Sequence, residues 1–251
     1  MEFSDAVADA YFDTVRRLSE AASSPVRQQG DHGVELMVSG IPLAKFNGVY
    51  HHRRETYAGE VDRLAAVVAQ ADIPWCIHTR AEPTPEIRAI AARWGRTEQN
   101  RTPTMVCRPG DLRPAGDPAA DLDIRVVGSA AYGAYLSTFV GGFEMAEDIA
   151  ATLMPPKLLD LPGATAYLGF VAGRPVTTGY GIRSGDFVGV MNIATEPAAR
   201  RRGYGRKITE RIVRDAFDDG AVATYLHASE DGFPVYEAMG FSTLETWTYL
   251  V

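Results

Sequence analysis

The chain has 251 residues, of which 46% are hydrophobic and 23% are charged. A chain of this length and composition can bury one large core or two smaller ones, which excludes a disordered or fibrous protein. The 32 Asp and Glu residues outnumber the 25 Lys and Arg residues, so the formal net charge is −7, and neither half has the basic excess that binding to a nucleic acid backbone requires.

The cysteines and the beginning of the chain indicate a cytoplasmic protein. Cys76 and Cys107 lie in apolar runs and are too few for a disulfide framework or a zinc cage. The start of the chain has acidic residues where a secretory signal has basic ones, and no apolar run approaches about 18 residues. The pair His51-His52 has no neighbouring thiolates or carboxylates to complete a metal site. We therefore expect a soluble, cytoplasmic protein with no metal, no membrane contact and no nucleic acid partner.

Helices and strands alternate in the N-terminal half. Apolar residues recur at helical spacing in some stretches, and short apolar runs are typical of strands. Thr84 precedes a proline and is suited to cap a helix. The predicted elements in chain order are a helix over 5–21, strands over 34–38 and 43–50, a helix over 56–70, a strand over 74–79, a helix over 85–94 and a strand from residue 105.

The clearest boundary is the stretch 108–121, where Pro, Gly and Asp replace periodic apolar positions. We interpret it as the connection between two domains of similar size. The sequence predicts an N-terminal α/β domain over 1–110, a linker over 111–121 and a second domain over 122–251.

The second domain has the pattern of a mixed, largely antiparallel sheet flanked by helices. Three strands joined by tight turns indicate an antiparallel meander. The predicted elements in chain order are a strand over 123–127, helical segments between 129 and 153, meander strands over 164–172, 175–182 and 187–195, a helix from 206 to 219, a strand over 222–228, a short helix over 234–239 and a strand over 243–251.

One junction between a strand and a helix contains the residues that indicate a binding site. The strand that ends near Thr195 leads into a loop with Gly203 and Gly205 and then into an amphipathic helix. Glycines let backbone N–H groups approach a bound anion, and the start of a helix adds unpaired N–H groups and a positive dipole end. The spacing does not fit a mononucleotide P-loop, and Ile208 stands where a dinucleotide fingerprint requires a third glycine.

The remaining pattern, Arg200-x-x-Gly203-x-Gly205, resembles the acyl-CoA-binding loop of the GNAT superfamily of N-acetyltransferases. A second segment, Leu226-His-Ala-Ser-Glu-Asp-Gly-Phe-Pro-Val-Tyr-Glu-Ala-Met-Gly-Phe241, is similar to the closing motif of that family, with Tyr-Glu on a short helix and Gly-Phe before the last strand. The resemblance covers about residues 122–251 and implies a GNAT-type fold for the second domain.

The resemblance also implies where acetyl-CoA binds. Backbone groups of the strand end would pair with the pantetheine arm, and backbone N–H groups of the loop would hold the pyrophosphate. Ser229 stands where many members have an asparagine that contacts the cofactor, which puts that contact in doubt. The implied cofactor-binding residues are Asn192, Ile193, Ala194, Thr195, Arg200, Arg201, Arg202, Gly203, Tyr204, Gly205, Arg206 and Ser229.

Three catalytic roles follow from the resemblance and from the chemistry of amine acylation. Tyr236 matches the family tyrosine that protonates the departing CoA thiolate, and a backbone N–H near Ile193 or Ala194 would polarise the thioester carbonyl. Because an ammonium has no lone pair, a base must deprotonate the acceptor amine. Glu144, in the Gly-Gly-Phe-Glu segment, is the first candidate for this base, and the alternatives are Glu196, His227 and Glu230.

The N-terminal domain has no phosphate loop. We interpret it as a smaller, degenerate GNAT-like copy that does not bind CoA, the alternative being a separate α/β cap. Phe46, Asn47 and Trp75 are candidates for one wall of an acceptor pocket, although core packing is the favoured interpretation of Trp75.

The predicted function is transfer of an acetyl group from acetyl-CoA to an amine, most simply that of a small molecule. The alternatives are a non-catalytic acyl-CoA sensor and an enzyme that acts on protein amines. The sequence leaves the acyl chain preference and a homodimer open.

Overall fold

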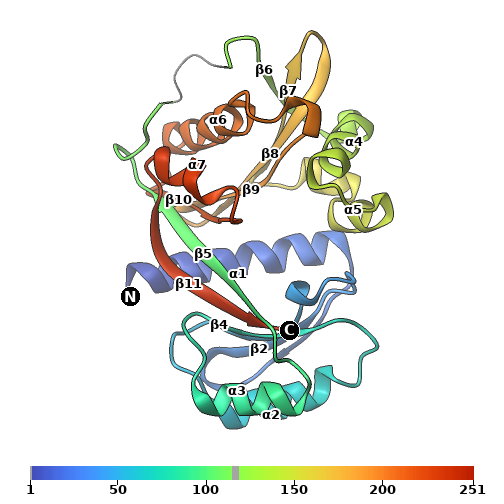
Figure 1. Ribbon diagram of the computed structural model, residues 1–251, viewed down its shortest axis with the longest axis vertical. Helices are drawn as coiled ribbons and strands as arrows, with labels where there is room; N and C mark the ends of the chain where they lie inside the picture. The colour runs from blue at the N-terminus through green and yellow to red at the C-terminus, as the bar shows by residue number, and fades with distance from the viewer. Residues whose placement is uncertain (1, 115–118) are drawn as a thin grey trace. The chain divides into compact units, whose positions relative to one another are not determined.

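The computed structural model describes residues 2–114 and 119–251, which form two compact units (Figure 1). Unit 1 comprises the chain up to Thr104 together with Thr243–Val251, and unit 2 comprises Met105–Ser242. The last strand of the chain therefore belongs to unit 1. The predicted domain division at 110 and 122 stays a prediction, and residues 115–118 of the predicted linker lie outside the described residues.

Unit 1 contains a sheet with the strand order β1-β2-β3-β4-β11. Neighbouring strands run antiparallel except β3 and β4, which are parallel. Its elements are α1 (Phe3–Ala22), β1 (Val26–Gln29), β2 (Val34–Val38), β3 (Asn47–His51), α2 (Ala58–Val68), β4 (Cys76–Thr79), α3 (Pro85–Arg93), the first part of β5 (Gln99–Cys107) and β11 (Ser242–Leu250).

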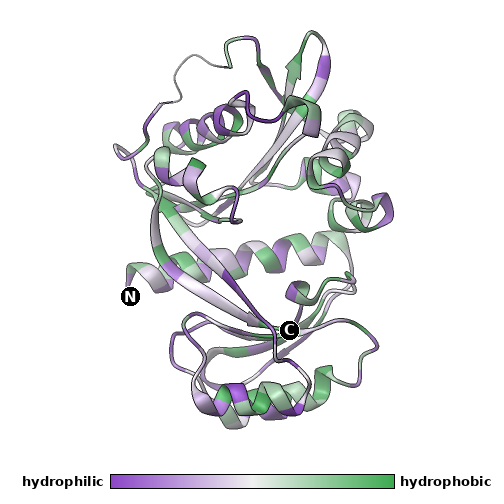
Figure 2. Cartoon of the chain, in the orientation of Figure 1, coloured by the Kyte–Doolittle hydropathy of each residue, from purple (hydrophilic) through white to green (hydrophobic). Residues whose placement is uncertain are grey.

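The helices of unit 1 cover both faces of its sheet. Leu36 and Ile77 are buried with residues of α2 and α3, whereas the adjacent Met37 and Cys76 are buried with Ala8 of α1. Successive residues of a strand point to opposite faces, so α1 lies on one face and α2 and α3 lie on the other. Figure 2 shows hydrophobic and hydrophilic residues alternating along α1, as expected of a helix with one buried side.

Unit 2 contains a sheet with the strand order β10-β9-β8-β7-β6. Strands β6 to β9 pair antiparallel in sequence order, and β10 pairs parallel to β9. Its elements are β6 (Asp123–Val127), α4 (Tyr132–Phe143), α5 (Glu147–Leu153), β7 (Ala164–Val171), β8 (Arg174–Ser184), β9 (Phe187–Thr195), α6 (Tyr204–Asp218), β10 (Ala223–His227) and α7 (Phe233–Ala238).

The sheet of unit 2 lies between α6 and the α4–α5 region (Figure 1). A Cβ atom added at Gly179 of β8 would lie 2.7 Å from Cδ1 of Ile212, so α6 packs directly on this glycine. The next residue, Tyr180, points to the other face, where its hydroxyl donates to the carbonyl of Leu158 at 2.6 Å. The missing side chain at Gly179 thus brings the helix close to the centre of the sheet.

Most predicted elements are confirmed, including the helix at the start of the chain, the meander and the helix after the glycine loop. Thr84 caps α3 by accepting a hydrogen bond from the N–H of Ile87 at 3.3 Å. Two strand predictions are wrong at their starts, because β3 begins only at Asn47, after a 3-10 turn, and β5 begins already at Gln99. Strand β1 was not predicted, since its sequence Val-Arg-Gln-Gln has no apolar alternation.

The two units repeat one order of elements. Unit 1 runs β1-β2-β3-α2-β4-α3, and unit 2 runs β7-β8-β9-α6-β10-α7. In each unit an antiparallel meander is followed by a helix and then by a strand parallel to the third strand of the meander. This agreement supports the interpretation of the N-terminal half as a copy of the same fold. Among the residues described, no helix is long and apolar enough to cross a membrane.

Candidate functional site

Strands β9 and β10 pair over only part of their length. The parallel register joins Phe187, Val188 and Gly189 of β9 to Ala223, Thr224 and Tyr225 of β10. Strand β9 continues to Thr195 without further register partners in β10 among the described residues. The edge of β9 that faces β10 is therefore open over its last residues, where the amides of an extended ligand arm can pair with backbone groups.

A bulge interrupts β9 at this open edge. On β8, Tyr180 is opposite Met191 and Thr178 is opposite Ala194, so Asn192 and Ile193 together face the single residue Gly179. Such a two-against-one arrangement is a β-bulge, which bends the strand and redirects its peptide groups. Asn192 has a φ of 54°, in the left-handed region that asparagine tolerates better than most residues.

The glycine loop ends in an open helix N-terminus. Gly203 is the N-cap of α6, with a φ of 82° and no side-chain cap, and the first turn has no acidic residue. The first N–H groups of the helix have no acceptor within the helix, so they are available to an anion. A Cβ atom added at Gly205 would lie 3.4 Å from Oγ1 of Thr195, which shows how closely this first turn approaches the end of β9.

The basic side chains of the loop divide into two groups. The Arg200 guanidinium donates to the carbonyls of Thr195 (3.1 Å) and Gly142 (2.9 Å) and pairs with Glu144. Arg206 donates to the carbonyl of Pro114 at 3.1 Å. These two guanidiniums hold neighbouring segments together.

Arg201 and Arg202, by contrast, are exposed, and no ion pair or side-chain hydrogen bond is recorded for either within the described part of the chain. They remain available to phosphate groups, together with the backbone N–H groups. Tyr204 is buried and donates from its hydroxyl to Asp121 at 2.9 Å, so its backbone rather than its side chain can face a cofactor.

Tyr236 lies on α7 and is partly buried beside the core of unit 2, with its ring tilted against that of Phe241 at a centroid distance of 5.8 Å. Burial raises the pKa of Tyr236 to about 12, so the phenol is protonated at neutral pH. Ser229 accepts a hydrogen bond from the N–H of Gly232 at 3.1 Å. This hydroxyl therefore stabilises the turn that leads into α7.

Glu144 is the residue that ends α4, with a φ of 53° and a side chain that is 63% exposed. Its Oε2 atom lies 2.8 Å from the Arg200 guanidinium. The structure thus brings the first candidate base together with the loop that follows β9. A Cβ atom added at Gly141 would lie 2.4 Å from Oε1 of Glu196, so the Glu196 carboxylate packs against the same end of α4. His227 is half-buried on β10, and Glu230 is exposed.

Several residues at this site were not predicted. A Cβ atom added at Gly142 would lie 2.7 Å from Cβ of Ala194 and 2.9 Å from the backbone nitrogen of Thr195, so α4 reaches the end of β9 only because this residue is glycine. The hydroxyls of Thr177 and Thr178 bond to carbonyls of the bulged strand. The Gly-Gly pair in a helical segment was a visible signal, whereas threonines in a strand are too common to provide one.

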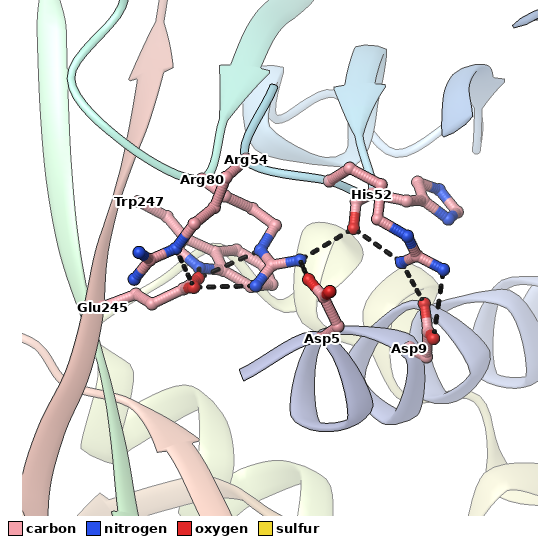
Figure 3. Close-up of polar contacts among 8 residues, drawn as sticks. Asp5, Asp9, His52, Arg54, Arg80, Glu245 and Trp247 are labelled. Atoms are coloured by element: carbon pink, nitrogen blue, oxygen red, sulfur yellow. Dashed lines mark hydrogen bonds and ion pairs between the residues drawn. The ribbon is translucent and has the colours of Figure 1, made fainter. Parts of the chain in front are cut away.

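The corresponding loop of unit 1, between β3 and α2, has a different structure. Arg53 pairs with Asp9, and Arg54 pairs with Glu245 at 2.8 Å. Arg80, the residue that follows β4, donates to the carbonyl of His52 at 2.9 Å. Figure 3 shows these contacts. The first turn of α2 also carries an acidic residue, Glu60, which opposes anion binding. These features support the prediction that unit 1 does not bind CoA.

Two of the three residues of unit 1 that were predicted to line a pocket are buried inside that unit. Asn47 is fully buried, with hydrogen bonds from the N–H of Ser39 and to the carbonyls of Ile41 and Pro74, so its prediction as a pocket residue is wrong. Trp75 is 5% exposed and belongs to the core, as favoured. Phe46 is partly buried.

Comparison with known families shows what the segment that contains this site is similar to. Residues 155–241 match the model of the Acetyltransferase (GNAT) family. This segment includes the meander, the glycine loop, α6 and α7. Residues 155–241 are therefore similar to a GNAT acetyltransferase domain. A comparison with curated protein sequences found no match.

Solved structures show that the GNAT fold extends over both halves. A GCN5-related N-acetyltransferase from Kribbella flavida is similar with a TM-score of 0.73 at 19% identity, over 99% of this chain and 95% of that one. A functionally unknown conserved protein from Staphylococcus epidermidis has a TM-score of 0.66 at 11% identity, over 90% and 93%. A putative acetyltransferase from Novosphingobium aromaticivorans has a TM-score of 0.54 at 14% identity, over 88% and 87%. The predicted fold class, with a GNAT-like N-terminal half, is confirmed.

Proposed function

We propose that this protein is an N-acetyltransferase that moves the acetyl group of acetyl-CoA to the amine of an acceptor by direct attack. One observation carries the proposal: the uncapped N-terminus of α6 lies next to the open, bulged end of β9. The backbone N–H groups of residues 201–206 would bind the pyrophosphate, with Arg201 and Arg202 adding charge. The end of β9, Asn192 to Thr195, would bind the pantetheine arm.

In this mechanism the amine attacks the thioester carbon, and the carbonyl oxygen becomes an oxyanion that a backbone N–H near Ile193 or Ala194 stabilises. The tetrahedral intermediate then breaks its C–S bond, and Tyr236 donates a proton to the CoA sulfur. A base removes the proton of the amine. No group of three or more His, Cys, Asp or Glu side chains in the described ranges could hold a metal ion, and the proposed steps require none.

The experiment that tests the function is calorimetric titration of acetyl-CoA into the wild-type protein, followed by thiol release with a panel of small amines and lysine peptides. Binding with turnover supports an acetyltransferase, and the active member of the panel reveals the acceptor class. Binding without turnover on any amine would instead favour an acyl-CoA sensor. Absence of binding at micromolar concentrations would contradict both.

Tyr236→Phe is expected to lower kcat by about 10²-fold, because proton donation by a positioned side chain contributes about this much. kcat/KM should fall equally, since the hydroxyl acts in the transition state rather than in substrate binding. With its pKa raised to about 12, Tyr236 stays protonated from pH 7 to 10, so it should cause no alkaline loss of kcat in that range. The measurement is the pH profile of kcat for both proteins.

The matched control is Tyr167→Phe. The Tyr167 hydroxyl bonds to Asp215 in the last turn of α6, about 16 Å along the helix from the loop. This variant should lose some stability and keep its kcat. An alkaline fall near pH 8 that disappears in Tyr236→Phe, or a kcat of Tyr236→Phe close to that of the wild type, would contradict the assignment.

The role of Glu144 as the general base stays a prediction. The Glu144 carboxylate is paired with Arg200, so this side chain has two candidate uses, proton abstraction and holding the loop. Glu144→Gln distinguishes the two uses of this side chain: a loss of kcat of about 10²-fold assigns proton abstraction to Glu144. A loss that also appears in Arg200→Gln, with a raised KM for acetyl-CoA, assigns it to holding the loop. Glu196→Gln is the corresponding test of the alternative base.

A further inference from the structure

We propose that Thr178 is a positioning residue that directs the backbone N–H of Ile193 towards the thioester carbonyl. The inference rests on the proposed function, because it concerns the donor that would stabilise the oxyanion. Thr178 lies on β8, and its hydroxyl contacts β9 at the carbonyl of Asn192. Its effect on the reaction would be exerted through one peptide group of the neighbouring strand.

The contact that supports this role is short and partly buried. Thr178 is 0% exposed, and its Oγ1 atom donates to the carbonyl of Asn192 at 2.7 Å. Thr177, also 0% exposed, donates from Oγ1 to the carbonyl of Ala194 at 2.8 Å. The two hydroxyls therefore hold the carbonyls on both sides of Ile193, within the bulge where regular strand pairing is interrupted.

The geometry of the peptide bond between Asn192 and Ile193 determines where the N–H of Ile193 points. The carbonyl of Asn192 and the N–H of Ile193 belong to one planar peptide unit, and no peptide bond in the described residues is cis. In a trans unit the C=O and N–H bonds point in opposite directions. Because the carbonyl points to Thr178 of β8, the N–H of Ile193 points away from β8. Strand β10 lies on that other side of β9, and its pairing has already ended at Gly189.

The bulge needs an anchor because its conformation is not intrinsically favoured. Asn192 is in the left-handed region, which costs a residue with a Cβ atom part of its conformational free energy. Without the Thr178 hydroxyl, the partly buried carbonyl of Asn192 loses its donor, and rotation of this peptide towards another donor becomes favourable. Such a rotation would turn the N–H of Ile193 away from the reacting carbonyl.

The test compares Thr178→Val, which keeps the shape and removes the donor, with Thr178→Ser, which keeps the donor. We expect Thr178→Val to lower kcat by about 10²-fold, as loss of an oxyanion donor does. Thr178→Ser should restore kcat to within about threefold of the wild type. The control is Thr224→Val on β10, another fully buried threonine of unit 2, whose Oγ1 has no hydrogen-bond partner among the described residues. This variant should retain wild-type kcat.

The outcomes separate this inference from the proposed function. Wild-type protein that neither binds nor turns over acetyl-CoA overturns both. Active wild-type protein together with an equally active Thr178→Val overturns only the role of Thr178. If Thr178→Val does not fold, amide hydrogen exchange of the wild type decides the question. The Ile193 amide should exchange fast in the free protein and become protected by acetyl-CoA, and strong protection without ligand would overturn the inference.

Discussion

Gly203→Glu is expected to lower the affinity for acetyl-CoA by at least about 100-fold, which corresponds to about 2.8 kcal/mol. The substitution places a carboxylate at the N-cap of α6, where it competes with the pyrophosphate for the free N–H groups and repels its negative charge. The φ of 82° at this position adds strain for any residue with a Cβ atom. Titration calorimetry at fixed ionic strength measures the effect.

Two control variants separate charge from backbone strain. Gly203→Ala introduces the strain without the charge and should lose much less affinity than Gly203→Glu. Gly185→Glu places the same side chain at another glycine of unit 2, in the turn between β8 and β9, where φ is 56° and a Cβ atom has no neighbour within 4 Å. Gly185→Glu should bind acetyl-CoA as the wild type does. Binding of acetyl-CoA to Gly203→Glu with nearly wild-type affinity would show that the loop is a structural turn.

Arg80→Met is expected to lower the free energy of unfolding by about 3–5 kcal/mol, because it leaves the buried carboxylate of Glu245 without its main partner. The Arg80 side chain is 0% exposed and that of Glu245 is 2% exposed, and they are joined by hydrogen bonds of 3.0 and 2.7 Å. Arg80 also pairs with Asp5 of α1 at 2.6 Å, so it connects α1, β4 and β11 (Figure 3). Urea denaturation at pH 7 measures the loss.

The pH dependence of this loss has a definite sign. Burial by itself raises the pKa of Glu245, but hydrogen bonds from Arg80, Arg54 and Trp247 outweigh it, and the net pKa lies below the ordinary 4.5. The pair therefore stabilises the protein at neutral pH, and this contribution is lost as the pH falls below 4.5. In Arg80→Met the deficit should be largest near pH 7 and should shrink in acid.

The control for this prediction is Arg93→Met, which removes the Arg93–Asp62 pair on the surface of unit 1. Its side chains are 57% and 43% exposed, and such pairs contribute about 0–1 kcal/mol. The double variant Arg80→Met/Glu245→Gln should recover part of the stability, because it removes the buried carboxylate that Arg80→Met leaves without its main partner. Equal stabilities of Arg80→Met and Arg93→Met would contradict a structural role of the buried network.

Local signals in the sequence were sufficient for much of the fold. The meander strands were predicted nearly to their observed ends because tight turns and strand-forming residues are adjacent in the chain. The cap at Thr84 was predicted because capping acts within three residues. Strand β1 and the start of β5 were not predictable from a local pattern, since polar residues such as Gln28 and Gln99 are held in strands by backbone pairing, of β1 with β2 and of β5 with β11.

The sequence by itself determined the nature of the candidate anion site, because Gly203, Gly205 and the helix that follows are consecutive and their chemistry is that of the local backbone. Only the tertiary structure decided which arginines are available to bind phosphate. The Arg200 guanidinium donates hydrogen bonds to the carbonyl of Gly142 and to the Glu144 carboxylate, and spacing along the chain does not reveal these contacts. The bulge and its threonine anchors likewise depend on the register between β8 and β9. The assignment of the last strand to unit 1 depends on pairing between β4 and β11, which are far apart in sequence. Local backbone chemistry is encoded in adjacent residues, whereas the partners of side chains and strand edges are chosen by the packing of the whole unit.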